Sequence, residues 1–243
     1  MTAYYPQPAA ANYFSPPSHA SLRQRGLRMC DQCGAAESPA VSKFRLCGGC
    51  MVTQYCSQAC QKVHWPAHKA ICQHTVEQVT AAKQGSGFSG DHIIKSLRKF
   101  TSSHCALLGW AGFQALQLKR VPANIRKNAL LIELEPTSDP DCNRRFTVVG
   151  THVVPRTFIC DPLVIGDIQR REQRCRQAGG IGTAVIIIQC GSYSQVMPVE
   201  VDPPAKISWD VRDDWAEVLY HFVETGRTDF QPISTTAQGI YYG

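Results

Sequence analysis

The hydrophobic pattern is clearest in the second half of the chain, where it predicts a mixture of helices and strands. Over residues 91–118 apolar side chains recur every three or four positions, which indicates an amphipathic helix. Residues 129–135 and 145–154 are short runs with Pro136 after the first and Pro155 after the second, a pattern typical of strands that can form a hairpin. Residues 181–190 are an apolar, β-branched run too short to span a bilayer, so they predict a central strand, with residues 194–201 as its partner.

Two more helices follow from polar patterns and from helix-end signals. Residues 167–178 are a polar helical segment closed by two glycines. Asp210 is a candidate N-cap for a later helix, and Gly226 stands just past the end of that helix. These elements together predict one α+β domain over residues 91–230. The apolar face of the last helix would consist of Val211, Trp215, Val218, Leu219 and Phe222.

Other parts of the chain have no such periodicity. Residues 1–28 are rich in Pro, Tyr, Ala and Ser and are predicted to be a disordered tail. Residues 74–90 end in the Gly- and Ser-rich stretch KQGSGFSG and are predicted to be a linker. Residues 231–243 are expected to form a C-terminal tail. Residues 29–73 remain, and they are distinguished by their cysteines.

Seven cysteines and one histidine in this segment are spaced as metal ligands. Zinc prefers four-coordinate sites of thiolate with an occasional imidazole, so eight ligands predict two structural Zn²⁺ ions. Two ligands that are close in the sequence supply half of one site, which gives four such pairs. The spacing alone leaves open whether consecutive pairs share an ion or whether the first pair joins the third and the second joins the fourth. The spacing is C-x2-C-x13-C-x2-C-x5-C-x3-C-x7-H-x3-C, and its members are Cys30, Cys33, Cys47, Cys50, Cys56, Cys60, His68 and Cys72.

Two alternatives bear on this interpretation. A disulfide framework also uses many cysteines, but the chain does not start with a secretion signal, so we expect an intracellular protein of the cytoplasm or nucleus. His64 competes with His68 as a ligand, and the H-x3-C spacing favours His68. Because protein side chains would fill both sites, the zinc is expected to be structural rather than catalytic and to supply the folding free energy of the segment.

The sequence YCSQACQKVHWPAHKAIC of residues 55–72 resembles the MYND-type zinc finger, whose pattern ends in YCSxxCQxxxWxxHKxxC. Residues 57–72 are expected to form two short helices, the second beginning at Pro66. The resemblance covers residues 30–72 and implies a small cross-braced fold with short helices and interleaved ligands. The first zinc would bind Cys30, Cys33, Cys56 and Cys60, and the second would bind Cys47, Cys50, His68 and Cys72.

The same resemblance implies a role in protein–protein interaction. Fingers of this family accept short proline-rich peptides of the P-x-L-x-P kind, and the matching contact residues here are Gln61 and Trp65. The layout of the whole chain also resembles small fungal MYND-finger proteins with an uncharacterised α+β region, which implies no activity. We therefore expect a non-enzymatic adaptor or regulatory protein.

Two other functions compete with this one. A SET-type lysine methyltransferase would need SET sequence on both sides of the finger and an N-H-S-C segment, and the sequence has neither. Nucleic-acid binding would use the net charge of +6 and the arginines of residues 167–178, but Asp167 and Glu172 interrupt that cluster. We expect neither nucleic acid nor membrane as a partner. The sequence also contains no Gly-rich phosphate loop, G-x-S-x-G or H-E-x-x-H motif.

Overall fold

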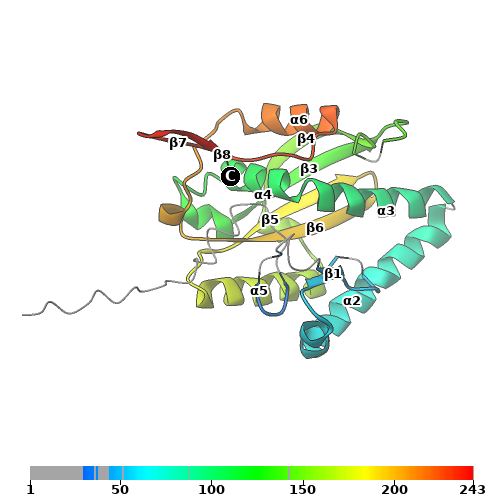
Figure 1. Ribbon diagram of the computed structural model, residues 1–243. Coiled ribbons are helices and arrows are strands. Elements are labelled where there is room, and N and C mark those ends of the chain that lie inside the picture. The colour runs from blue at the N-terminus through cyan, green and yellow to red at the C-terminus, as the bar shows by residue number, and fades with distance from the viewer. Residues whose placement is uncertain are drawn as a thin grey trace, which may run out of the picture.

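A four-stranded sheet with helices on both faces forms the centre of the protein, and the cysteine-rich segment lies beside it (Figure 1). The computed structural model describes residues 30–35, 37, 44–50, 52–86, 88–141 and 143–242. The predicted tail of residues 1–28 lies outside these residues. A cross-braced finger followed by an α+β arrangement confirms the predicted fold class.

The predicted strands form this sheet. They are β3 (Asn128–Pro136), β4 (Phe146–Pro155), β5 (Gly182–Cys190) and β6 (Tyr193–Val201), in the order β4-β3-β5-β6. β3 pairs antiparallel with β4, so the hairpin is confirmed, and β5 pairs antiparallel with β6. β3 and β5 are parallel, and the long connection that such a pair requires consists of β4 and the helix after it. β5 is a central strand, as its apolar run predicts.

Helices cover the two faces of the sheet. On one face lie α3 (Phe88–Ser103), α4 (Cys105–Ala115) and α6 (Trp215–Thr225), which pack on the strands through Phe100, Leu108 and Leu219. On the other face, α5 (Pro162–Gln177) packs against β3 and β5 through Ile168. Three short 3-10 turns connect these elements, at Pro122–Arg126, Arg156–Phe158 and Pro204–Lys206. None of the helices in the described ranges combines the length and the apolar content that crossing a bilayer requires.

Two helix boundaries differ from the prediction. The expected helix over residues 91–118 is divided at His104 into α3 and α4, because the backbone of His104 leaves the helical conformation. α5 begins five residues before the predicted start at residue 167, since the carboxylate of Asp161 accepts hydrogen bonds from the backbone N–H of Leu163 and Val164 at 2.9 and 3.3 Å. This N-cap and the proline after it define the first turn.

The cysteine-rich segment continues into a long helix where the sequence predicts a break and a linker. α2 (Gln58–Ser86) includes Pro66 and most of residues 74–90, so the expectation of two short helices followed by a flexible linker is wrong. A proline inside a helix removes one backbone hydrogen bond, but Cys60 before it and His68 after it are both held in the ligand sets described below. Further along, α2 packs against α3 and α5. Nε2 of His74 there lies 2.5 Å from a carboxylate oxygen of Asp161.

The C-terminal residues are also more ordered than the sequence predicts. In place of the expected tail, residues 231–243 contain the antiparallel hairpin of β7 (Ile233–Thr236) and β8 (Gly239–Tyr242). The carboxylate of Asp210 does not cap α6 and instead accepts hydrogen bonds from the backbone N–H and the hydroxyl of Thr235 at 2.9 and 2.7 Å. Asp214 occupies the N-cap position of α6. Gly226 ends α6 in the left-handed conformation, which confirms the prediction for this end.

Two glycines of α4 lie against the sheet at different distances. A Cβ atom at Gly112 would lie 2.9 Å from the Cδ1 and Cγ1 atoms of Ile186 on β5, which is closer than side chains pack. A Cβ atom at Gly109, one turn earlier, would make an ordinary contact of 3.5 Å with Val199 on β6. Gly112 thus allows close approach of the helix to the sheet, whereas Gly109 does not have this function.

We expect Gly112→Ala to lower the free energy of unfolding by about 1–3 kcal/mol, because Ile186 lies fully buried and has little space to move. The matched substitution Gly109→Ala should be neutral or stabilising by up to about 1 kcal/mol, since alanine favours the helix. Urea denaturation of both variants measures the two effects. Equal stability changes in the two variants would contradict the close packing at Gly112.

Candidate metal centre

The predicted ligands come from two turns, one short hairpin and one helix. The hairpin pairs β1 (Arg45–Leu46) with β2 (Gln54–Tyr55). Cys30 and Cys33 flank a turn before it, and a second turn between the two strands carries Cys47 and Cys50. Cys56 follows β2 directly. The remaining ligands, Cys60, His68 and Cys72, lie on α2 at helical spacing.

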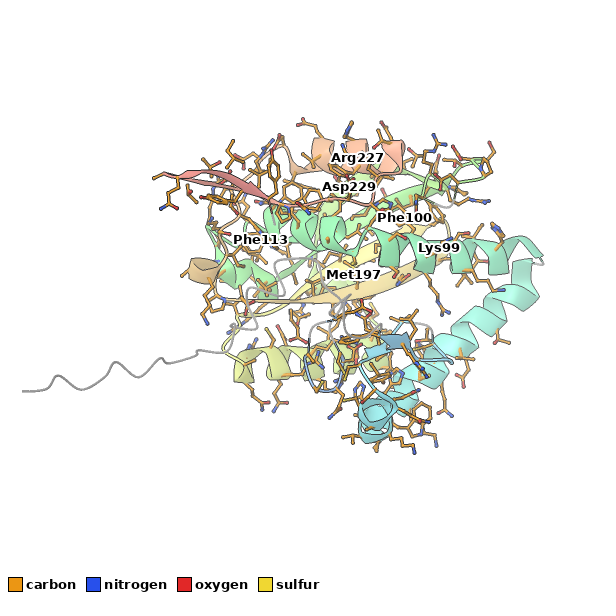
Figure 2. All side chains as sticks on the ribbon, viewed as in Figure 1. Lys99, Phe100, Phe113, Met197, Arg227 and Asp229 are labelled. Carbon is orange, nitrogen blue, oxygen red and sulfur yellow. The ribbon has the colours of Figure 1, made fainter. Side chains whose placement is uncertain are left out.

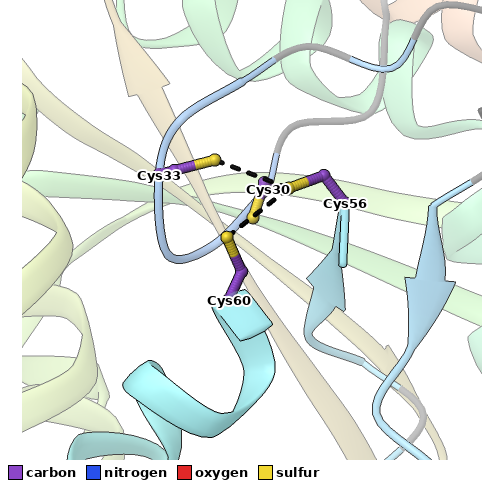
Figure 3. Close-up of side chains that lie close together, drawn as sticks. All are labelled: Cys30, Cys33, Cys56 and Cys60. Carbon is purple, nitrogen blue, oxygen red and sulfur yellow. Dashed lines mark hydrogen bonds between the residues drawn. The ribbon is translucent and has the colours of Figure 1, made fainter. Parts of the chain in front are cut away.

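The first set consists of Cys30, Cys33, Cys56 and Cys60, whose sulfur atoms all lie within 4.8 Å of one another. Figure 3 shows the four side chains pointing toward one another from the first turn, the end of β2 and the start of α2. The Sγ atoms of Cys33 and Cys56 are 3.6 Å apart, and those of Cys56 and Cys60 are 3.5 Å apart.

The second set consists of Cys47, Cys50, His68 and Cys72, and all four side chains are buried. The Sγ atoms of Cys47 and Cys72 are 3.7 Å apart, and Nε2 of His68 lies 3.5 Å from Sγ of Cys50. The other ring nitrogen of His68, Nδ1, lies 3.5 Å from the hydroxyl of Thr53. This contact orients the imidazole so that Nε2 faces the three sulfurs, as supporting residues commonly do for a metal-bound histidine.

The geometry of both sets fits zinc. A tetrahedral ion with Zn–S bonds of about 2.3 Å separates its sulfur ligands by roughly 3.8 Å. The observed sulfur separations of 3.5, 3.6 and 3.7 Å are close to this value. Donor type also fits, because zinc accepts four thiolates or three thiolates with one imidazole. Each set would hold one ion with no open position, which makes the metal structural.

The pKa values of the thiols explain why these sets need a cation. Burial alone would raise the pKa of Cys50, but hydrogen bonds from His68 and from the backbone of Thr53 and Val52 outweigh it and lower the pKa to about 6. In the same set, burial and the neighbouring Cys47 raise the pKa of Cys72 to about 12. The closely packed thiols of one set therefore cannot all lose their protons without a positive charge nearby. A bound Zn²⁺ supplies the charge that stabilises them as thiolates.

His64, the alternative ligand, lies outside both sets. Its ring is buried, and its Nδ1 atom lies 2.9 Å from the hydroxyl of Tyr55. The ring stacks on that of His68 with centroids 5.4 Å apart. Burial, and then the positive charge of Arg170, lower the pKa of His64 to about 4. His64 thus packs as a neutral residue beside the second set, and His68 lies in that set, as the H-x3-C spacing predicts.

Comparison with known families agrees with this geometry. Residues 30–72 match the family model of the MYND finger. These residues form a MYND finger. The interleaved pairing that the resemblance implied is present in the structure, and it gives the MYND finger its cross-braced fold. No solved structure matches the chain.

The two residues predicted to contact a peptide lie on the first turns of α2 in the MYND finger. Trp65 is 40% exposed, and Gln61, one turn earlier, is partly buried. The indole of Trp65 meets the ring of His68 edge-on, with centroids 6.1 Å apart. The ligand set thus supports the indole from one side and leaves another part of its surface exposed.

One functional residue that sequence reasoning missed is Asp31, between the first two ligands of the MYND finger. Its Oδ2 atom accepts a hydrogen bond of 2.8 Å from the backbone N–H of Gln54, and its Oδ1 atom forms an ion pair with Arg171 of α5. Arg171 also donates to Asp167 at 2.8 Å, and Arg174 donates to the carbonyl oxygen of Asp31. The finger is therefore attached to the α+β domain through buried charges. No local sequence signal marks this contact, because Asp31 and α5 are far apart along the chain.

We expect Cys56→Ser to release the first zinc and unfold the finger, because a hydroxyl is a poor substitute for a thiolate ligand. Native mass spectrometry should find two Zn²⁺ ions in the unmodified chain and fewer in this variant. Cys160→Ser is the matched control, since Cys160 is an exposed cysteine outside both sets, and it should retain two ions. Two ions in Cys56→Ser would contradict the assigned ligand set.

We expect Arg171→Met to destabilise the attachment of the finger by about 3–5 kcal/mol, because it leaves the buried carboxylate of Asp31 without its partner. Hydrogen exchange should then increase in α5 and around Gln54. Arg120→Ala is a suitable control, because it removes the exposed ion pair of Arg120 with Asp213 and should have little effect. Unchanged exchange at Gln54 in Arg171→Met would show that the ion pair is not required for docking.

Proposed function

We propose that the finger binds a proline-rich segment of a partner protein and that the chain acts as a non-enzymatic adaptor. MYND fingers are zinc-binding modules for protein–protein interaction, and residues 30–72 belong to this class. The more specific proposal concerns the ligand, a P-x-L-x-P-like peptide, and its contacts with Gln61 and Trp65. An extended proline-rich peptide loses little conformational entropy on binding, and an indole face can cover a prolyl ring.

The observation that carries the proposal is the exposed yet supported position of Trp65. A tryptophan that only stabilised the small core would be expected to lie fully inside it, whereas this side chain is 40% exposed. Its contact with His68 limits its motion, so little rotamer entropy is lost when a ligand binds. Large, rigid aromatic side chains of this kind are common anchors of binding surfaces.

The charges of α5 favour this proposal over nucleic-acid binding. Each of the four arginines that could contact phosphates is already close to a carboxylate, so these side chains stabilise the fold. Displacing such partners would offset much of the gain from phosphate contacts. The pairs are Arg170 with Asp167, Arg171 with Asp31, Arg174 with Glu200 and Arg176 with Glu172.

Trp65→Ala should weaken binding of a P-x-L-x-P peptide at least about 30-fold, corresponding to about 2 kcal/mol for an anchor residue. Isothermal titration calorimetry on the zinc-loaded chain measures this change. Val63→Ala, an exposed position on the same helix, is the control and should bind like the unmodified chain. Native mass spectrometry should find two Zn²⁺ ions in both variants.

A Trp65→Ala variant that retains both ions and full affinity would contradict the proposal. Salt provides a second criterion for the kind of ligand. Peptide binding that depends on apolar and aromatic contacts should change little between roughly 50 and 200 mM salt, whereas binding to phosphates falls steeply over that range. Tight, strongly salt-dependent binding of an oligonucleotide would favour nucleic acid instead.

A further inference from the structure

A groove of about 840 Å³ borders the outer edge of β6, which is the last strand in the order of the four-stranded sheet. Its lining includes all of residues 195–202. Within this stretch, Val199 faces Gly109 of α4 on one side of the sheet, whereas Glu200 pairs with Arg174 of α5 on the other. Because both faces of the strand contribute, the groove runs along the edge of the sheet rather than over one face.

The part of the groove that α3 forms is basic. Lys95, Arg98 and Lys99 all line it, and their spacing of three and four residues places them on one face of the helix. Further along α3, the hydroxyl of Thr101 donates a hydrogen bond of 3.3 Å to Oε1 of Gln195, so α3 lies beside the start of β6. The basic side chains therefore gather at one end of the groove.

The opposite end of the groove is apolar and aromatic. Phe113 of α4 packs with Val201 at the end of β6 in one cluster of buried side chains. The ring of Phe113 also meets that of Trp209 edge-on, with centroids 5.4 Å apart. All of these side chains line the groove. Met197 of β6 lies between the two ends, with Lys99 on one side of it and Phe113 on the other (Figure 2).

The wall opposite α3 has nearly balanced charges. Asp31 of the finger forms an ion pair with Arg171, and Glu200 forms one with Arg174. Both pairs line the groove. The lining has one further carboxylate among the described residues, that of Asp202, which is buried next to the apolar end. The positive charge of the groove therefore comes from the three basic side chains of α3.

The chain itself has few acidic residues that could neutralise this end of the groove. α3 contains one, Asp91, near its start. Residues 1–29 and 38–43, which lie outside the described ranges, contain no Asp or Glu. Lys99 is exposed and takes part in none of the ion pairs among the residues that the structure describes. An acidic group of a binding partner would therefore complement the basic end.

The backbone of β6 favours a peptide as this partner. Pro198 lies in the middle of the strand opposite Val185, and a proline cannot donate to the β5 ladder, so its position faces outward. Directions alternate along a strand, so the N–H and C=O groups of Val196 also face outward. An extended peptide can bond to these groups, whereas the hydrocarbon chain of a fatty acid would leave them without partners.

We propose that the groove binds an extended, acidic segment of a partner protein, which adds a strand to β6 and places an Asp or Glu side chain against α3. Alternate side chains of such a strand point to the same wall. On the side of α3 and α4, the acidic side chain contacts Lys99, and the apolar ones contact Met197 and Phe113. The contact is separate from the proposed site for proline-rich peptides, because neither Gln61 nor Trp65 is among the described residues that line the groove.

Binding of short peptides to the full zinc-loaded chain tests the proposal. The probes are the peptides ETVTVTF and FTVTVTE, blocked at both ends and free of proline. They place the acid at opposite ends of an alternating strand and so cover both strand directions. Matched probes carry lysine in place of glutamate. One of the acidic peptides should bind at least roughly tenfold more tightly than its lysine counterpart, as measured by fluorescence anisotropy.

A charge reversal at α3 tests the position of the acid. Lys99→Glu should weaken binding of the acidic peptide roughly tenfold or more and should strengthen binding of the lysine counterpart, because the attraction at this wall changes sign. Lys127→Glu is the matched control, since Lys127 is an exposed lysine that does not line the groove. It makes the same change in net charge and should bind both peptides like the unmodified chain. Equal effects of the two substitutions would overturn the proposal, because only the net charge would then matter.

Three other results would also overturn the proposal. If neither acidic peptide binds more tightly than its lysine counterpart, the basic wall does not select an acid. If dodecanoate binds and Lys99→Glu abolishes this binding while no peptide binds, the ligand is a free carboxylate with an apolar chain and the edge of β6 is not used. If the chain is a dimer that binds the peptides only after it dissociates on dilution, a second copy is the natural occupant of the groove.

Discussion

The buried carboxylate of Asp31 connects the finger to the rest of this protein. It lies between two zinc ligands, bonds to the backbone of Gln54 in the finger and forms an ion pair with Arg171 of the α+β domain. A carboxylate removed from water is stable only with such partners. The turn that carries Cys30 and Cys33 therefore keeps its docked position only while α5 supplies a partner for Asp31. Metal binding and domain packing are energetically linked through this one side chain.

Metal ligation also explains why local sequence signals failed in α2. Pro66 normally ends a helix, and the Gly- and Ser-rich stretch before residue 90 normally forms a loop. In this protein Cys60 lies before the proline in one ligand set, and His68 lies after it in the other. The continuous helix lacks one backbone hydrogen bond at Pro66, but it places a ligand in each of the two metal sites. The later part of the helix is held by packing on α3 and α5 and by the contact of His74 with the carboxylate of Asp161.

The sequence was most informative where the chemistry is local. Ligand type, spacing and the choice of His68 over His64 depend on near neighbours, and apolar runs such as residues 181–190 indicate their strand directly. The interleaved ligand pairing required the family resemblance, because spacing fits both arrangements. Long-range contacts could not be predicted. Asp210 has the features of a helix cap, yet its carboxylate bonds to Thr235, which no pattern near Asp210 indicates.

The proposed peptide site is not the only role of the finger, because Asp31 and Leu46 of the finger also line a groove that borders β6. Asp31 contributes to both the docking of the finger and the lining of that groove. Loss of zinc would disorder the turn that carries Asp31, remove the ion pair with Arg171 and open the groove on one side. On this argument the two zinc ions stabilise the whole chain, and the finger cannot be regarded as an independent module.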